Sequence, residues 1–318
     1  MPLTYRPIEV SKENAKLVAD LHTRAEPDEP DDWMVILHGW NNSTPGYTRE
    51  RFFIDVDGVP SGAARHAHPI QVRRDSFSSI QVYLVPEALS VGRLAEAYTF
   101  IEGRTTAAGL KVMETYVYQD DAVQSAALGS RNWQPDRTAK VWELDLVEER
   151  ERLLEIAADS RLKMGEQGIR CLPLAADADP GRYRKLHELA ERAARDIPTT
   201  MPMREGKLSE FMAFLAGPQI DEGRYWIARD GDHIIGLSHL KYPPVQGNIW
   251  TGFTASSPDY RGRGVARAVK METLVQAIEL AIPRVRTDND SENAPMIHIN
   301  ETLGYSALPA LQSYLKRV

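Results

Sequence analysis

The sequence of 318 residues contains a single cysteine, Cys171, so an intrachain disulfide and a cysteine-based zinc site are excluded. Cys171 precedes Leu172 and lies near Leu174, and we interpret it as a small core residue rather than a nucleophile. No apolar run approaches the ~20 residues that span a bilayer, and the N-terminus lacks the apolar core of a signal peptide. We therefore expect a cytoplasmic protein with no membrane partner.

Basic clusters are missing as well. The formal net charge is −7, and no basic stripe interleaved with aromatics occurs. Nucleic acid is therefore not an expected partner, whereas a cationic amine suits an acidic protein better. Residues 288–292 look like the start of a calcium loop, but Asn293 replaces its glycine and Ile299 its bidentate glutamate, so no metal site is predicted.

One order of elements occurs twice along the chain. In the first half, the patterns predict strands over 4–10, 51–57, 63–68, 76–85 and 110–118, and helices over 11–22, 91–104 and 121–128. In the second half, they predict strands over 169–174, 225–229, 234–240 and 249–255, and helices over 180–197 and 265–282. An amphipathic helix over 147–163 joins the halves. We predict a duplicated domain: residues 1–147, a connecting helix 148–167, and residues 168–318.

The most informative motif is residues 258–266, Pro-Asp-Tyr-Arg-Gly-Arg-Gly-Val-Ala, which follow a strand and open a helix. Gly262 and Gly264 leave backbone N–H groups uncovered by any Cβ, facing the space that an anion would fill. A dinucleotide fingerprint needs a small residue where Arg267 stands, and a Walker loop needs a Gly-Lys-Ser/Thr ending. The turn is therefore predicted to bind a pyrophosphate of another kind.

This motif resembles the Arg/Gln-x-x-Gly-x-Gly/Ala signature of the GCN5-related N-acetyltransferases (GNATs). The later Leu303-Gly304-Tyr305 resembles the close of that family's final helix, and the likeness covers residues from about 168 to 318. It implies acetyl-CoA as the cofactor and an α/β (α+β) fold of two tandem domains, each a mixed, mostly antiparallel sheet with two splayed strands and flanking helices. In the second domain, the later of these two strands would lie over 283–287. It also implies a set of cofactor-binding residues: Ser256, Arg261, Gly262, Arg263, Gly264, Val265, Ala266, Asn289, Asn293 and Met296.

The usual catalytic positions of this family carry other residues here. Trp250 stands where many members place a glutamate base, and Asn300 stands where a tyrosine often serves as the leaving-group acid. Strand alternation predicts that Trp250, Gly252, Thr254 and Ser256 share one face, which makes Thr254 the polar side chain nearest the thioester.

Two further residues complete the catalytic candidates. His239 is a possible base, although a lone strand histidine is more often structural. Tyr305 could replace the missing acid, although it can equally be a packing residue.

The two halves are not equivalent. Aligning residues 86–92 with 258–264 places Leu89 and Ser90 opposite Arg261 and Gly262. A serine Cβ would close part of the space that Gly262 leaves free. The first half is therefore predicted to be a degenerate, catalytically silent copy.

Together these features predict an acetyl-CoA-dependent N-acetyltransferase that transfers an acetyl group to the amine of a small molecule by direct attack on the thioester. The alternative is a non-catalytic acetyl-CoA-binding or regulatory protein, because the usual acid and base are replaced. The sequence leaves open which amine is used, and whether the chain is a monomer with an internal pseudo-dimer or a homodimer.

Overall fold

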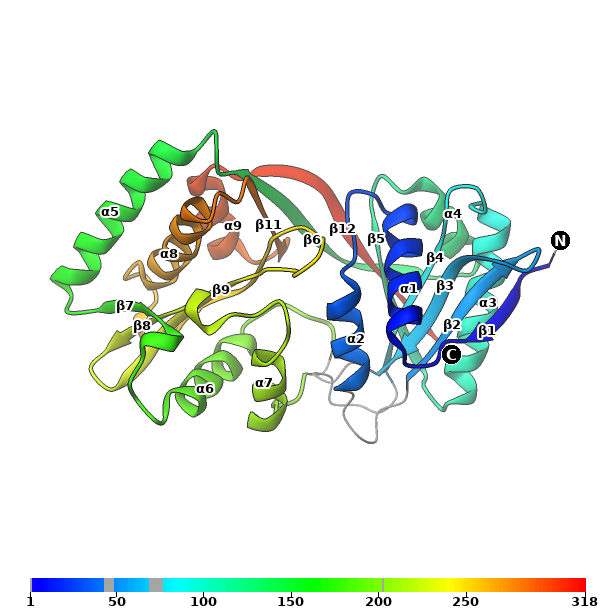
Figure 1. Cartoon of the computed structure of the whole chain (residues 1–318), viewed down its shortest axis with the longest axis horizontal. Coiled ribbons are helices and arrows are strands. Elements are labelled where there is room, and N and C mark those ends of the chain that lie inside the picture. Colours follow the sequence, from blue (N-terminus) through cyan, green and yellow to red (C-terminus); the bar gives the residue numbers. More distant parts are fainter. Residues whose placement is uncertain (1, 43–48, 69–76, 202) are drawn as a thin grey trace.

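The computed structural model describes residues 2–42, 49–68, 77–201 and 203–318. These residues form one continuous twelve-stranded sheet (Figure 1). From edge to edge, its strands are β1 (Thr4–Pro7), β2 (Arg49–Val56), β3 (Val59–Ala67), β4 (Phe77–Leu84), β5 (Val112–Tyr118), β12 (Ser306–Arg317), β6 (Gln134–Asp145), β11 (Arg284–Asp290), β10 (Trp250–Ser256), β9 (His233–Lys241), β8 (Tyr225–Asp230) and β7 (Arg170–Pro173).

The helices pack against this sheet in two groups, one per half (Figure 1). The first group is α1 (Lys12–Ala25), α2 (Trp33–Asn41), α3 (Val91–Ala107) and α4 (Ala122–Ser130). The second group is α5 (Arg150–Glu166), α6 (Arg182–Ala194), α7 (Leu208–Leu215), α8 (Val265–Glu279) and α9 (Ala294–Leu303). Ser11 begins α1 by accepting a hydrogen bond from the backbone N–H of Asn14, as its sequence position indicates. The predicted mixed α/β fold is confirmed.

The two halves exchange their last strands. β6, from the first half, pairs antiparallel with β11 of the second half. β12, at the end of the chain, pairs antiparallel with β5 of the first half. β6 and β12 also pair with each other, so they form the centre of the sheet. Each half is thus completed by a strand of the other, and the division at about residue 147 stays a prediction.

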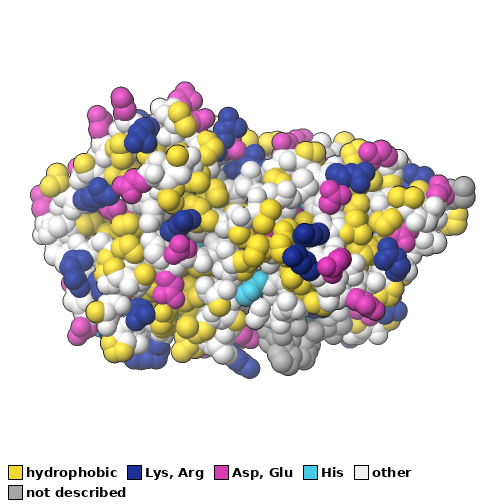
Figure 2. Space-filling model, in the orientation of Figure 1, with side chains coloured by type: hydrophobic (Ala, Val, Ile, Leu, Met, Phe, Trp, Pro, Cys, Tyr) yellow, Lys and Arg dark blue, Asp and Glu magenta, His cyan; other side chains and the backbone are white. Residues whose placement is uncertain are grey.

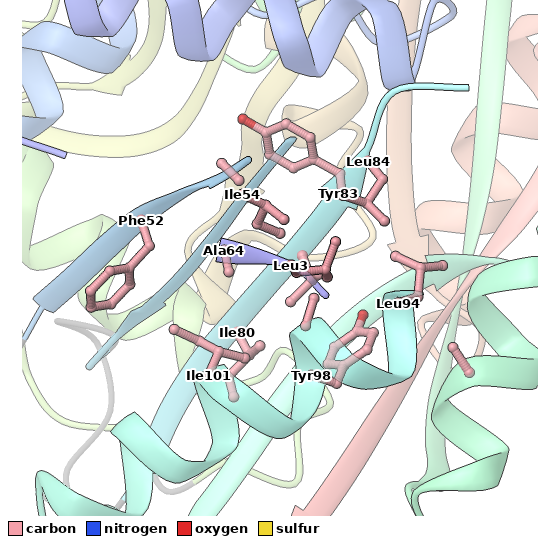
Figure 3. Packing of buried hydrophobic residues seen from close by; sticks show 14 of the residues in the cluster. Leu3, Phe52, Ile54, Ala64, Ile80, Tyr83, Leu84, Leu94, Tyr98 and Ile101 are labelled. Atoms are coloured by element: carbon pink, nitrogen blue, oxygen red, sulfur yellow. The ribbon is translucent and has the colours of Figure 1, made fainter. Parts of the chain in front are cut away.

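Each half has its own hydrophobic core. In the first half, Phe52, Ile80 and Ile101 are buried between the strands and α3 (Figure 3). Tyr83 extends to the opposite side, where its hydroxyl donates to the carbonyl of Val18 on α1. Burying one such large apolar side chain contributes about 1.5–3 kcal/mol to folding. In the second half, α8 packs on α5 and on the strands β8 to β10.

The surface has no dominant basic region on the face shown in Figure 2, where lysine and arginine side chains lie among aspartate and glutamate side chains. Across the described residues, no helix is both long and apolar enough to cross a bilayer.

Candidate cofactor and acceptor site

The turn between β10 and α8 has the conformation that its glycines permit. Gly262 and Gly264 adopt φ values of 74° and 83°, in the left-handed region that favours glycine. Gly264 is the N-cap of α8 and provides no side-chain cap, so the N–H groups of the first turn are left for another acceptor. A Cβ placed on Gly262 would meet no atom within 4 Å. An open turn with uncapped N–H groups at a positive helix end fits a pyrophosphate.

The equivalent turn in the first half is already capped. Ser90 is the N-cap of α3, and its Oγ accepts a hydrogen bond from the N–H of Arg93 at 3.3 Å. Ser90 therefore occupies the position of Gly264, not that of Gly262 as the sequence alignment predicts.

The reason for this difference is a shorter loop. The tight turns that precede the two helices match, because Leu89 and Arg261 each donate to the carbonyl of a proline three residues earlier. Beyond these turns, the first half has no counterparts of Gly262 and Arg263. The loop that would surround an anion is therefore missing from the first half.

The other predicted cofactor residues surround the α8 turn or lie on α9 and β11. Arg261 forms an ion pair with Asp196, and Nε of Arg263 donates to Oε1 of Gln167 at 2.9 Å. Both arginines are thus engaged by the protein, so the backbone of this loop is its main anion-binding group. The remaining residues are placed as follows: Ser256 ends β10, Val265 is buried at the start of α8 beside Ala266, Asn293 is the N-cap of α9, and Met296 is half-buried on α9.

β10 and β11 separate at this site. They run parallel with one registered pair, Trp250 with Arg286, and then diverge. In β10 the register against β9 shifts at Gly252, because Thr251 pairs with Leu240 whereas Phe253 pairs with His239. Such a bulge leaves the backbone groups of the extra residue outside the ladder.

The bulge overturns one prediction about side-chain direction. Trp250 is opposite Lys241, and Lys241 shares a face of β9 with His239. Thr254 is opposite Ser238, which is on the other face of β9. Trp250 and Thr254 therefore lie on different faces of the sheet, because one extra residue reverses the alternation.

His239 fills the space beside the bulge. A Cβ on Gly252 would lie 2.1 Å from Nε2 of His239. The imidazole is 3% exposed, stacks on Tyr225 at 4.5 Å and meets Phe214 edge-on at 5.5 Å. Within the described residues, neither ring nitrogen has a hydrogen-bond partner. Burial, together with the charge of Lys241, lowers its pKa to about 3, so the ring is neutral and weakly basic near pH 7.

On the other face, three of the predicted residues form one buried polar cluster. Asn300 donates to Oδ1 of Asn289 at 2.5 Å and accepts from Nζ of Lys270 at 2.7 Å. That ammonium lies 4.7 Å from the ring centre of Tyr305. Burial lowers the pKa of Lys270 to about 7, so Lys270 is the titratable donor of the cluster. Sequence reasoning missed it, although a lysine within the buried stripe of a helix was a visible signal.

The hydroxyl of Thr254 is also engaged. Thr254 is buried, and its Oγ1 is 2.8 Å from Oγ of Ser238. The catalytic roles of Thr254, Asn300, His239 and Tyr305 stay predictions.

Asp288 is a carboxylate whose importance sequence reasoning also missed. It lies two residues beyond Arg286 on β11, so its side chain shares the face of Arg286 and, through the registered pair, of Trp250. The side chain is exposed, and partial desolvation by its surroundings raises its pKa, with Lys241 acting in the opposite direction. A carboxylate at this divergence is placed to accept a proton from an amine.

The corresponding divergence in the first half is strongly acidic. β4 and β5 run parallel from the Phe77–Val112 pair to the Ser79–Glu114 pair. Beyond these pairs, where β4 and β5 end, lies a pocket of about 440 Å³. Its lining includes five carboxylates and the cationic side chain of Arg286. The carboxylates are Glu26, Asp28, Glu29, Asp120 and Asp121. Burial and this crowding raise the pKa of Glu26 to about 7. Such a pocket repels a pyrophosphate.

Solved structures show the same architecture. A tandem GNAT protein from the clavulanic acid biosynthesis pathway superposes with a TM-score of 0.75 at 15% identity, covering 99% of this chain and 98% of that one. A GCN5-related N-acetyltransferase from Sphaerobacter thermophilus gives 0.70 at 17% identity, covering 99% and 95%. A GNAT-family acetyltransferase from Colwellia psychrerythraea gives 0.60 at 13% identity, covering 99% and 100%.

The sequence itself matches a family as well. Residues 185–305 match the model of the Acetyltransferase (GNAT) family, whereas a search of curated proteins finds no match. The fold and the α8 turn therefore define a protein of two tandem acetyltransferase-like domains. Residues 185–305 thus match the GNAT family, and the whole chain has the fold of tandem GNAT proteins of known structure.

Proposed function

We propose that this chain is an acetyl-CoA-dependent N-acetyltransferase that acts on a small-molecule amine, with the C-terminal copy catalytic. The observation that carries the proposal is the uncapped start of α8 behind two left-handed glycines, beside the diverging β10 and β11. The backbone N–H groups of residues 262–266 would hold the pyrophosphate. Acetyl-CoA, when bound, supplies the acetyl thioester that the amine attacks.

The chain supplies a proton acceptor and hydrogen-bond donors for this reaction. Oδ of Asp288 would take the proton of the amine, because it lies on the face shared with Trp250 and, unlike Glu143 and Asp290, is not paired with an arginine in the described residues. Backbone groups at the Gly252 bulge are outside the ladder with β9 and are available to a developing negative charge. His239 would shape the acceptor side as a neutral ring rather than take the proton.

The first half supports the assignment of a single catalytic copy. Its helix start is capped by Ser90, and the pocket at its diverging strands is lined by carboxylates. Acidic groups around Asp288 and Glu29 favour a cationic amine at the acceptor side. The proposal includes a cytoplasmic location and no nucleic-acid partner.

The test is an amine panel assayed for release of free CoA, followed by Asp288→Asn with the most active amine. We expect kcat to fall by about 10²-fold or more with acetyl-CoA affinity unchanged, because a general base contributes about 10²–10⁴-fold. Glu292→Gln is the matched control, since this exposed carboxylate pairs with Arg137 instead.

The pH dependence has a defined sign. Because the pKa of Asp288 is raised, the wild-type rate falls as the pH drops through that pKa and the carboxylate becomes protonated. The pH–rate profile of D288N should lack this acidic decrease. Acetyl-CoA binding with no turnover of any amine would favour the non-catalytic alternative. Full activity of D288N would remove Asp288 from the reaction.

A further inference from the structure

The first half contains a second hollow, on the face of its sheet that α1 and α2 cover. This pocket of about 600 Å³ is lined, in the described part of the chain, by both helices and by β2, β3 and β4. It is separate from the acidic pocket at the end of β4, and only Tyr83 lines both.

Three arginines lie side by side on this face. Arg49 and Arg51 are two residues apart on β2, so their side chains share a face, and Arg51 is directly opposite Arg65 on β3. The guanidinium of Arg51 lies over the ring of Trp40 on α2, 4.6 Å from its centre. That contact identifies this face as the one that forms the pocket.

Asp31 and Glu50 also line the pocket, and the charge of Asp31 favours the charged form of Arg65, but neither carboxylate forms an ion pair with the three arginines. Glu50 pairs with Arg104 at the opposite sheet face, and Asp31 pairs with His22. Within the described residues, none of the three arginines forms an ion pair, and the buried Nε of Arg49 has no hydrogen-bond partner. Like charges placed directly opposite each other on neighbouring strands destabilise a sheet.

One of the arginines is held in position by a chain of hydrogen bonds. Nε of Arg65 donates to Oε1 of Gln81 at 2.7 Å. Nε2 of Gln81 in turn lies 3.3 Å from Nε2 of His22. Nδ1 of His22 lies 3.2 Å from a carboxylate oxygen of Asp31 but forms no hydrogen bond within the described residues. This chain fixes Arg65 through Nε and leaves its two terminal nitrogens for another acceptor.

Two of the three arginines, Arg49 and Arg51, are half-buried. Burial lowers the pKa of both, and the charges of Arg49 and Arg65 lower that of Arg51 further. Arg65 lines the hollow but is exposed. A cluster of partly desolvated, mutually repelling guanidinium groups gains free energy when an oxyanion enters.

We propose that this hollow is a binding site for a small organic anion that carries a carboxylate or a phosphate. The head group would lie among Arg49, Arg51 and Arg65, since planar guanidinium groups bind both oxyanions bidentately. Val18, Ile36, Trp40 and Tyr83 line the pocket and provide an apolar wall for the rest of the ligand. The volume is within the range of small-molecule sites. The first half would thus have kept a ligand site while lacking a phosphate-binding turn.

The experiment titrates the full chain with phenyl phosphate, benzoate and inorganic phosphate at constant ionic strength, by calorimetry and thermal unfolding. We expect saturable binding of at least one aromatic probe, weakened about tenfold or more in Arg51→Gln and Arg65→Gln. Arg24→Gln is the control, because this exposed arginine pairs with Glu87 outside the pocket and should bind like wild type. Comparing phenyl phosphate with benzoate identifies the head group, and inorganic phosphate tests the apolar wall.

Stability of the ligand-free protein gives an independent readout. R51Q should unfold at the wild-type temperature or above it, because it removes a like-charge pair. Absence of binding by every probe, equal weakening in R24Q, or marked destabilisation by both R51Q and R65Q would overturn the proposal. Acetyl-CoA affinity, measured on the same samples, reports on the α8 turn alone, so failure here is distinguishable from failure of the proposed acetyltransferase.

Discussion

At the scale of single residues, Lys270 is the most unusual group of the C-terminal half. Its fully buried ammonium has a folded-state pKa of about 7, against 10.5 for the unperturbed side chain. Between these two values the unfolded chain binds more protons than the folded chain, so stability rises with pH across this window.

Replacement by methionine, which has a similar length, tests this assignment. The free energy of unfolding of the wild type, measured by urea denaturation, should rise relative to Lys270→Met from pH 7 to pH 10, by at most about 1.4 kcal/mol per pH unit. Parallel pH profiles for the two proteins would show that Lys270 does not titrate in the folded state as assigned.

Gly252 and His239 form a second testable pair. Gly252→Ala places a Cβ where Nε2 of His239 lies, and we expect it to cost about 1–3 kcal/mol of stability through overpacking. In a His239→Ala background the same change should cost much less, because the space is then open. Equal costs in both backgrounds, measured by thermal unfolding, would mean that the two residues do not compete for space.

The residue scale also shows what sequence can and cannot predict. A glycine turn that opens a helix is a local feature, so the motif placed the start of α8 correctly, and the left-handed φ of Gly262 and Gly264 accounts for the glycines. The faces of Trp250 and Thr254 depend on a bulge fitted to a histidine of the neighbouring strand, which no local pattern encodes. From sequence alone, Asp288 is interpreted as part of a segment that resembles a calcium loop, because the extent of β11 and its pairing with β6 cannot be seen there.

At the scale of elements, the α8 turn distinguishes the two halves. Deleting Gly262 and Arg263 would give the second half the loop length of the first, and we expect acetyl-CoA affinity to fall about tenfold or more through lost N–H contacts. Gly58→Ala is the control, since it perturbs a left-handed glycine in the β2–β3 turn of the first half and leaves the α8 turn at its full length. If calorimetry gives the same affinity for the deletion and the wild type, the cofactor does not use this turn.

The predicted elements agree with most of the fold, and the exceptions have physical causes. Apolar periodicity located the strands from β1 to β5 and from β7 to β10, together with the long helices, and the family resemblance located β11. α2 and α7 were missed because their short, mostly apolar segments show no helical stripe, and β12 because Pro309 interrupts its pattern. β6 was missed because charged residues break its apolar run.

At the scale of the whole molecule, strand exchange joins two unequal copies into one sheet. β6 and β12 could not be assigned from sequence, because pairing between distant strands is set by the completed fold rather than by local composition. One copy retains an open phosphate-binding turn, and the other has a capped helix, an acidic pocket and an arginine-lined hollow. The account therefore predicts two sites of different chemistry, one in each half.

Calorimetric titration of the full chain with acetyl-CoA tests this asymmetry most directly. The account predicts one site per chain, and binding that is lost when Gly262 and Arg263 are deleted, because only the second half has uncapped N–H groups at its helix start. Two equivalent sites, or one site that survives the deletion unchanged, would contradict it.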